Sequence, residues 1–158
     1  MIFVIVGSQR FPFDRLIREV DRLKETGAIA DEVVAQIGAS GYEPRHLKWQ
    51  RFMDKSDFDA AIAACDLLIT HAGEGSIMTG LLKGKKVIAV PRYAKLGEHV
   101  SDHQLEIAQA LEKQRCIVNV EDIGQLENAV RTIDQMELKP YRSGNDSIIH
   151  LLREFIGD

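Results

Sequence analysis

At 158 residues the chain is long enough for one domain with a buried core, and 45% hydrophobic with 28% charged residues is the composition of a globular protein. The formal net charge of −4 offers no basic surface for wrapping a polyanion, so we expect no nucleic-acid partner. No apolar run approaches the roughly 20 residues that cross a bilayer, and the N-terminus lacks the basic flank of a secretory signal, so we expect a cytoplasmic protein.

Short apolar runs alternate with amphipathic stretches along the chain. Residues 2–6 form a continuous apolar run that ends at Gly7, which is typical of a strand buried on both faces of a parallel sheet. Residues 13–26 follow, with apolar side chains on one helical stripe and Gly27 as a C-terminal cap. Further strands are predicted at 32–37, 47–52, 66–70, 86–90 and 116–120, and further helices at 57–64, 76–82, 102–114 and 123–134.

This alternation of strands and helices predicts the fold class. It indicates an α/β protein with a Rossmann-like, mostly parallel sheet, helices on both faces and right-handed crossovers. Ligands of such sheets bind beyond the carboxyl ends of the strands, so functional residues are expected in the loops after strands. We predict a single domain over 1–158, with a core at 1–135, a linker at 136–146 and a C-terminal amphipathic helix at 147–156.

Two interpretations of the predicted C-terminal helix stay open. Its sequence SIIHLLREFI places apolar side chains on one face and polar side chains opposite. Such a terminal helix commonly packs on the sheet of its own domain. The alternative is a docking helix for a partner subunit.

The two cysteines, Cys65 and Cys116, lie alone in apolar stretches without CxxC spacing or a histidine companion. This pattern predicts buried, reduced thiols rather than a disulfide or a zinc site. No DxD-like carboxylate pair lies beside the glycine-rich sequence HAGEGS at residues 71–76. We therefore predict neither a metal nor another cofactor.

The most informative loop has the sequence HAGEGS, between the predicted strand 66–70 and the predicted helix 76–82. Gly73 and Gly75 let the backbone turn tightly and approach a ligand, and the first N–H groups of a helix have no intrahelical partners. Ser76 is expected as the N-cap or as a hydroxyl donor to phosphate. The alternative is a sharp turn with a serine cap, because turns use glycine widely. In its parallel-sheet context the loop favours diphosphate binding.

Charged and titratable side chains modify this prediction. His71 ends the strand and, like Arg92 in a later loop, is a candidate for offsetting the charge that grows on a departing phosphate. Glu74 would repel an anion inside the turn. We therefore expect Glu74 to be a charge at the helix start that points outward.

A long polar loop follows the predicted strand KVIAV. Arg92 and Lys95 are candidates for neutralising phosphates. Ser101 or Asp102 can cap the next helix, whose first turn would present Asp102 and Gln104 to vicinal sugar hydroxyls. The alternative is a solvated loop with a good N-cap.

HAGEGS, followed by VPR and GEHVSDHQLEIA, resembles the C-terminal, donor-binding domain of glycosyltransferase family 28. The opening MIFVIVGSQRFPFDRLI and the GEHxxDHQ stretch are most similar to short bacterial proteins related to the soluble subunit of the split UDP-N-acetylglucosamine transferase of dolichol-linked oligosaccharide synthesis. Similar bacterial proteins act in exopolysaccharide or capsule assembly. The resemblance extends from residue 1 to about residue 120, and it implies one half of a GT-B glycosyltransferase.

The resemblance also implies roles for residues in three loops. The glycine turn would hold the UDP diphosphate with a histidine beside it, through His71, Gly73, Gly75 and Ser76. The first glycine loop would lie near the phosphates and the reaction centre, with Gly7 and Ser8. The loop before the predicted helix 102–114 would recognise the donor sugar, with Glu98, His99, Asp102 and Gln104.

One position departs from the family pattern. Family members often place a glutamate in the helix after the glycine turn, where it accepts the ribose hydroxyls, and the matching residue here is Thr79. As a hypothesis, Glu98 supplies the missing carboxylate from the facing loop.

The resemblance further implies what this chain lacks. Family 28 enzymes have two Rossmann-like halves, and this chain has the length of one. We therefore expect the UDP-sugar-binding subunit of a two-subunit enzyme that transfers a hexose to a lipid-linked sugar. The general base would belong to a membrane-associated acceptor-binding subunit, which would recruit this chain to the inner face of the membrane. Two alternatives stay open: a non-catalytic enhancer or regulatory subunit, and a small nucleotide-processing hydrolase.

Overall fold

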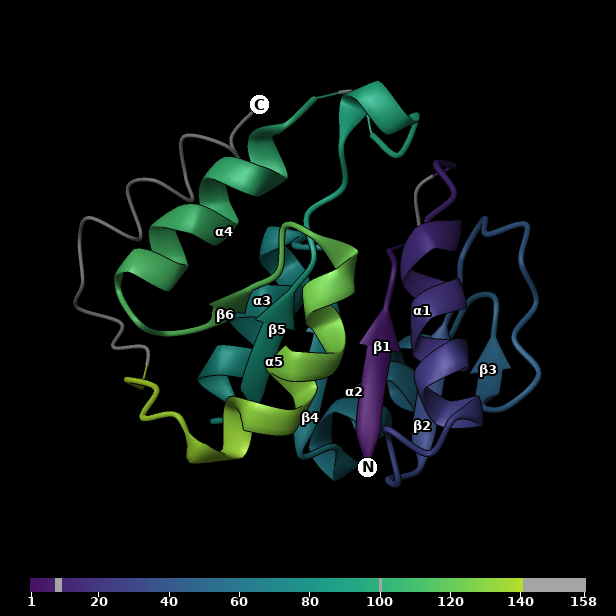
Figure 1. Cartoon of the computed structure of the whole chain (residues 1–158), viewed down its shortest axis with the longest axis horizontal. Helices are drawn as coiled ribbons and strands as arrows, with labels where there is room; N and C mark the ends of the chain where they lie inside the picture. The colour runs from purple at the N-terminus through teal and green to yellow at the C-terminus, as the bar shows by residue number, and fades with distance from the viewer. Residues whose placement is uncertain (8–9, 100, 141–158) are drawn as a thin grey trace.

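The computed structural model describes residues 1–7, 10–99 and 101–140 (Figure 1). Ser8, the predicted helix 147–156 and most of the predicted linker lie outside the described residues. One sheet has the strand order β3-β2-β1-β4-β5-β6, and each pair of neighbouring strands is parallel. The strands are β1 (Ile2–Ile5), β2 (Val33–Gln36), β3 (Lys48–Gln50), β4 (Leu67–Thr70), β5 (Lys86–Ala89) and β6 (Val118–Asn119).

The helices and 3₁₀ turns lie between these strands and after the last of them. They are α1 (Asp14–Glu25), α2 (Lys55–Ala64), α3 (Glu74–Leu82), η1 (Ala94–Leu96), α4 (His103–Lys113), η2 (Ile123–Gln125), α5 (Leu126–Thr132) and η3 (Ile133–Gln135). Every strand and helix predicted within the described residues is therefore present. The predicted helix 123–134 was wrong in detail, because only its middle is α-helical and a 3₁₀ turn flanks it on each side.

Alternate side chains of each central strand enter two different cores, which is why these strands are apolar throughout. In β1, Ile2 and Val4 belong to one core, and Phe3 and Ile5 belong to the other. Helices α1 and α5 cover the first core, whereas α2, α3 and α4 cover the second (Figure 1). The α/β fold with helices on both faces of a parallel sheet is confirmed. Both cysteines are free and buried, as predicted.

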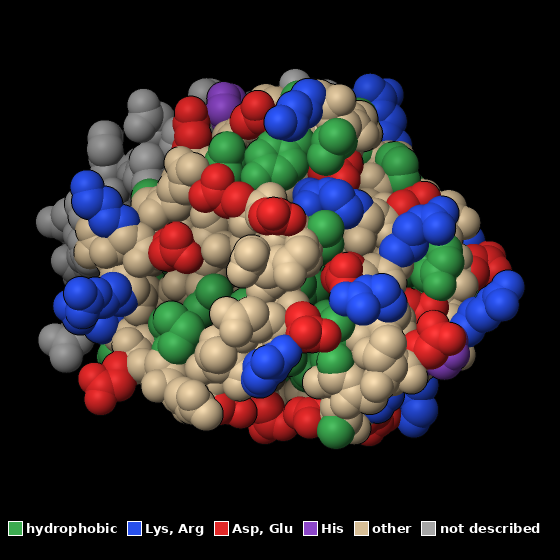
Figure 2. Space-filling view, viewed as in Figure 1, with side chains coloured by type: hydrophobic (Ala, Val, Ile, Leu, Met, Phe, Trp, Pro, Cys, Tyr) green, Lys and Arg blue, Asp and Glu red, His purple; other side chains and the backbone are tan. Residues whose placement is uncertain are grey.

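The surface seen in the same orientation carries Lys and Arg side chains interspersed with Asp and Glu side chains (Figure 2). Within residues 1–7, 10–99 and 101–140, no helix is long and apolar enough to cross a membrane.

Candidate functional site

The centre of the sheet holds the point where the chain changes direction. β1 and β4 are neighbours, but β2 follows β1 on one side while β5 follows β4 on the other. The loops that leave β1 and β4 therefore diverge at the carboxyl ends of these strands, which is where ligands of such sheets bind. Gly7 follows β1 and Gly73 follows β4. The two predicted glycine loops thus meet at the topological switch point of the fold.

His71 explains why both loops need glycine. A Cβ atom on Gly7 would lie 2.9 Å from Nε2 of His71, and a Cβ atom on Gly73 would overlap the same nitrogen. Gly7 also has a φ of +87°, which disfavours any residue with a side chain. The imidazole therefore fills the space between the two loops, and close packing requires these glycines before any ligand arrives.

The imidazole of His71 is uncharged at neutral pH. Burial, with a contribution from the positive charge of Arg92, lowers its pKa from 6.5 to about 3. Nδ1 lies 3.2 Å from the carbonyl oxygen of Ile5, and since a carbonyl only accepts, we assign the proton to Nδ1. Nε2 is then an acceptor that faces the glycine loops. In the protein without ligand His71 therefore carries no charge, and its role beside a departing phosphate stays a prediction.

The glycine turn starts its helix two residues earlier than predicted. Gly73 is the N-cap of α3, with extended backbone angles, and no side chain caps the helix. Ser76 lies inside the first turn, so its predicted N-cap role was wrong. Glu74 is in the first turn, as predicted, and is half-buried. The first-turn N–H groups of α3 have no intrahelical acceptors, because their partners would precede the helix, so this turn retains the donors that an anion needs.

Arg92 and Gln104 are buried and bond to each other. Arg92 is 1% exposed, and its Nε donates a hydrogen bond of 3.1 Å to Oε1 of Gln104. Burial lowers the pKa of Arg92 to about 10, so the guanidinium stays charged at neutral pH. Its Nη1 is buried without a hydrogen-bond partner in the described part of the chain. Arg92 is therefore a fixed positive charge beneath the loop, not a surface cation.

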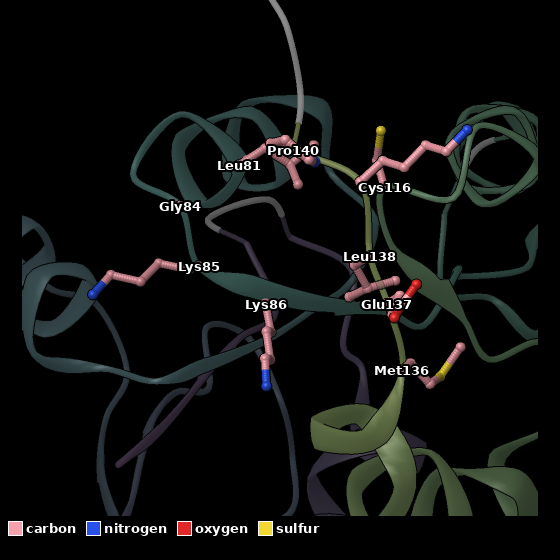
Figure 3. A pocket seen from close by; sticks show the side chains of 10 residues that line it. Leu81, Gly84, Lys85, Lys86, Cys116, Met136, Glu137, Leu138 and Pro140 are labelled. Carbon is pink, nitrogen blue, oxygen red and sulfur yellow. The ribbon is translucent and has the colours of Figure 1, made fainter.

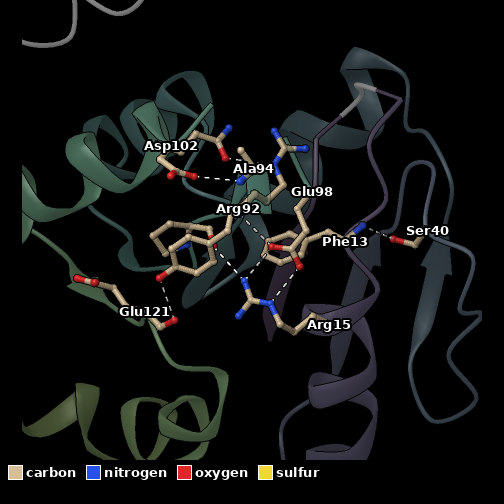
Figure 4. A network of polar contacts seen from close by, with 11 residues as sticks. Phe13, Arg15, Ser40, Arg92, Ala94, Glu98, Asp102 and Glu121 are labelled. Carbon is tan, nitrogen blue, oxygen red and sulfur yellow. Dashed lines mark hydrogen bonds and ion pairs between the residues drawn. The ribbon is translucent and has the colours of Figure 1, made fainter. Parts of the chain in front are cut away.

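The carboxylate of Glu98, which was predicted to bind ribose, binds Arg15. Its Oε2 accepts from Nε of Arg15 at 3.0 Å, and its Oε1 accepts from Nη2 of Arg15 at 3.1 Å (Figure 4). Oε1 also accepts from the backbone N–H of Tyr93 at 3.1 Å. Glu98 is 6% exposed. These three donors occupy the carboxylate, which argues against the hypothesis that it replaces the missing glutamate at Thr79.

Asp102 and His99 lie in the more open part of the same loop. Asp102 is at the N-cap of α4, as predicted, but its Oδ1 accepts from the backbone N–H of Ala94 at 3.0 Å rather than from α4 (Figure 4). The half-buried His99 has Nδ1 3.1 Å from the carbonyl oxygen of Ser101, and its ring lies 5.8 Å from that of Phe11. Burial is the main cause that lowers the pKa of His99, and the positive charge of Arg92 is the second. The lowered pKa favours the neutral form of His99.

Arg15 is the functional candidate that the sequence analysis missed. It lies in the first turn of α1, where a cation faces the positive end of the helix dipole. That unfavourable position was the available signal, because a basic residue there needs an acidic partner from elsewhere. The acidic partner is 83 residues away, and the sequence pattern does not identify it.

A separate cavity of about 390 Å³ lies at the opposite edge of the sheet, where β5 begins (Figure 3). Leu81, Lys86, Cys116 and Leu138 are among its lining residues. It contains none of the predicted site residues. Among the described residues, no group of three His, Cys, Asp or Glu side chains is arranged to hold a metal ion. Metal independence stays a prediction.

Comparisons with known proteins identify the family of this chain. A model of the glycosyltransferase family 28 C-terminal domain matches residues 1–155. The human UDP-N-acetylglucosamine transferase subunit ALG13 is 34% identical over 122 residues, which are 72% of this chain and 10% of that protein. A UDP-N-acetylglucosamine–N-acetylmuramyl-(pentapeptide) pyrophosphoryl-undecaprenol N-acetylglucosamine transferase of Phocaeicola vulgatus is 37% identical over 86 residues, 52% of this chain and 22% of that protein. The chain thus spans a small fraction of either relative.

The fold is also found among solved structures. The NMR solution structure of ALG13 has a TM-score of 0.66 and 20% identity, and the match covers 99% of this chain and 96% of that one. At this identity the likeness shows the fold alone, which is the Rossmann-like half of a GT-B glycosyltransferase. Because the family model matches nearly the whole sequence, the chain belongs to the glycosyltransferase family 28 C-terminal domain family.

Proposed function

We propose that this chain binds the donor of a glycosyltransferase, a UDP-sugar, with the diphosphate at the first turn of α3. The observation that carries the proposal is the start of α3, which has no side-chain cap and lies at the switch point between β1 and β4. The free N–H groups of α3 and the buried charge of Arg92 add positive potential there. The uracil, the ribose and the sugar would extend from this turn along the carboxyl edge of the sheet.

The reaction we propose is transfer of a hexose to a hydroxyl of a lipid-linked sugar. The bond between the anomeric carbon and the β-phosphate oxygen breaks, and the acceptor oxygen bonds to that carbon while its proton passes to a base. Negative charge grows on the departing UDP. Preorganised N–H donors stabilise that charge, each favourable interaction at a helix end contributing about 0.3–1 kcal/mol, and up to ~2 kcal/mol when partly buried.

We assign the acceptor site and the base to a second polypeptide. Two findings support this assignment: the matching family model describes a C-terminal domain, and the human relative is named a transferase subunit. The P. vulgatus relative is named for an undecaprenol-linked acceptor, which supports a lipid-linked sugar as the acceptor. The partner would recruit this chain to the cytoplasmic face of the membrane. Purified alone, the chain should bind UDP but transfer negligible sugar to a polyprenyl-linked acceptor.

Substitution of Gly75 by Ala tests the diphosphate site. A Cβ atom on Gly75 would meet no atom of the protein within 4 Å, so the side chain is compatible with the fold. Alanine in a helix is more stable than glycine by roughly 0.5–1 kcal/mol, so the variant should unfold at a slightly higher temperature. If phosphate lies on this turn, the methyl group obstructs it, and calorimetry should record a UDP affinity about tenfold lower. An unchanged affinity would remove the diphosphate from the turn.

One observation favours a second candidate, a regulatory subunit that does not hold the donor. The hydroxyl of Thr79 donates to the carbonyl oxygen of Gly75 at 2.7 Å, and Arg15 occupies the carboxylate of Glu98. Thr79 has no carboxylate, and that of Glu98 is already bonded, so neither position offers a free carboxylate to the ribose hydroxyls. A chain that stimulates a partner transferase without binding UDP would support this candidate. Hydrolysis of nucleoside monophosphates would instead support the nucleotide-processing alternative.

A further inference from the structure

We infer that Arg15 is a positioning residue for the donor loop: through Glu98 it holds the loop that follows β5 against the start of α1. The donor-recognition role of that loop rests on the proposed function, whereas the clamp itself rests on contacts in the free protein. The sequences FPFDR (residues 11–15) and GEH (residues 97–99) would then form one structural unit across the switch point.

The contacts of Arg15 are of the kind that fix a loop. Its Nη2 donates to the backbone carbonyl oxygen of Pro91 at 3.1 Å, in addition to its two bonds with Glu98 (Figure 4). Its guanidinium lies 5.2 Å from the ring centre of Phe13 and 5.5 Å from that of Tyr93. Arg15 therefore contacts Pro91 and Tyr93 near the start of the loop and Glu98 further along it, all from one position on α1.

Because the Arg15–Glu98 ion pair is largely buried, we expect it to stabilise the conformation of the loop after β5. The side chain of Glu98 is 8% exposed and that of Arg15 is 21% exposed. A carboxylate at this depth is costly without its cation, and the planar fork of arginine matches both of its oxygens. Without Arg15, the loop has to open for Glu98 to regain water. Of the contacts that hold the loop after β5, the one from Arg15 is therefore expected to contribute most.

A second contact joins the same two segments. The ring of Phe11, in the loop after β1, lies 5.8 Å from the ring of His99, next to Glu98. Within the loop after β5, Glu98 accepts from the N–H of Tyr93 and Asp102 accepts from the N–H of Ala94. Each bond closes the loop on itself. The clamp thus links the first glycine loop to the loop proposed to read the sugar.

Four variants test the clamp: Arg15→Met, Glu98→Gln, the double variant, and Arg15→Lys. Hydrogen exchange of the backbone amides of residues 93–99, measured without ligand, should accelerate about tenfold in both single variants, because the loop opens. The double variant should exchange no faster than either single variant, since the two residues act through one interaction. Arg15→Lys, which keeps the charge but not the fork, should fall between Arg15→Met and the wild type.

Calorimetric titration with UDP-glucose and UDP-N-acetylglucosamine is the second measurement. Both single variants should weaken binding of any sugar nucleotide that the wild type binds, by about tenfold and by similar factors. Loss in Glu98→Gln with none in Arg15→Met would make Glu98 a direct ligand and overturn the inference. Lower melting temperatures with unchanged loop exchange and unchanged affinity would reduce the pair to a structural role and overturn it too.

A matched control lies one turn along α1. Arg18 stacks on Tyr42, 4.7 Å from the ring centre, on the side of the loop after β2. Arg18→Met should leave the exchange of residues 93–99 unchanged. If the wild type binds neither sugar nucleotide, the proposed function is wrong. The exchange measurement, which needs no ligand, still shows whether Arg15 and Glu98 hold the loop. Should Arg15→Met not fold, Glu98→Gln and Arg15→Lys provide the same comparison.

Discussion

The loops after β4 and β5 lie side by side at the carboxyl edge, yet they are held by different forces. The turn after β4 is short and is fixed by packing, with His71 wedged between Gly7 and Gly73. The loop after β5 is long and is fixed by hydrogen bonds of charged groups, from Arg15 to Glu98 and from Arg92 to Gln104. The shape of the first therefore depends on close packing, and that of the second depends on side chains from distant parts of the sequence.

Because the two loops are held differently, we expect different substitutions to destabilise them. A packed turn should respond to added volume and to protonation of its buried ring, because neither can be accommodated without movement. A loop held by charge pairs should respond to removal of a partner, since an unpaired buried charge is costly.

Acid should destabilise the turn after β4. The pKa of His71 is lowered from 6.5 to about 3 by folding, so the unfolded chain takes up a proton first as the pH falls. The free energy of unfolding should therefore decrease below pH 6.5, by at most about 1.4 kcal/mol per pH unit from this group. Denaturant titrations between pH 6.5 and 4.5 measure the slope.

His71→Gln is the control for that slope. Glutamine does not titrate, so the variant should lose most of the pH dependence in this window. The lowered pKa of His99 acts in the same direction and should leave a smaller residual slope. An equal slope in the variant and the wild type would contradict the assignment of a neutral, buried His71.

Gly73→Ala should damage both stability and binding. Its Cβ atom would overlap Nε2 of His71, whose ring is enclosed by the sheet and the two loops. We expect a loss of about 1–3 kcal/mol in the free energy of unfolding, as for other overpacked sites. UDP affinity should fall as well because the turn shifts. Thermal unfolding beside Gly75→Ala, which adds the same methyl group in open space, isolates the role of His71.

Arg92→Met should affect both stability and binding in the second loop. Methionine removes a desolvated cation but leaves the buried Oε1 of Gln104 without its donor, so the free energy of unfolding should fall by about 1–2 kcal/mol. UDP affinity should fall about tenfold because positive potential is lost, while affinity for uridine should not change. Equal losses for UDP and uridine would show that Arg92 supports the loop rather than the phosphates.

The order of strands and helices was predictable from local pattern, because each central strand is apolar on both faces and each helix begins or ends at a polar or glycine boundary. The glycine turn at Gly73 was predictable for the same reason, since its determinants lie within a few residues. The start of α3 was not, because Gly73 itself takes the N-cap position and Ser76 is left inside the helix.

The amino-acid sequence by itself determined the α/β architecture and the position of the glycine turn, since hydrophobic periodicity and backbone freedom act over short distances. Only the tertiary structure decided the charge state of His71 and the partners of Glu98 and Arg92. Burial depends on what the whole chain packs around a group, and the two halves of the Arg15–Glu98 pair are 83 residues apart.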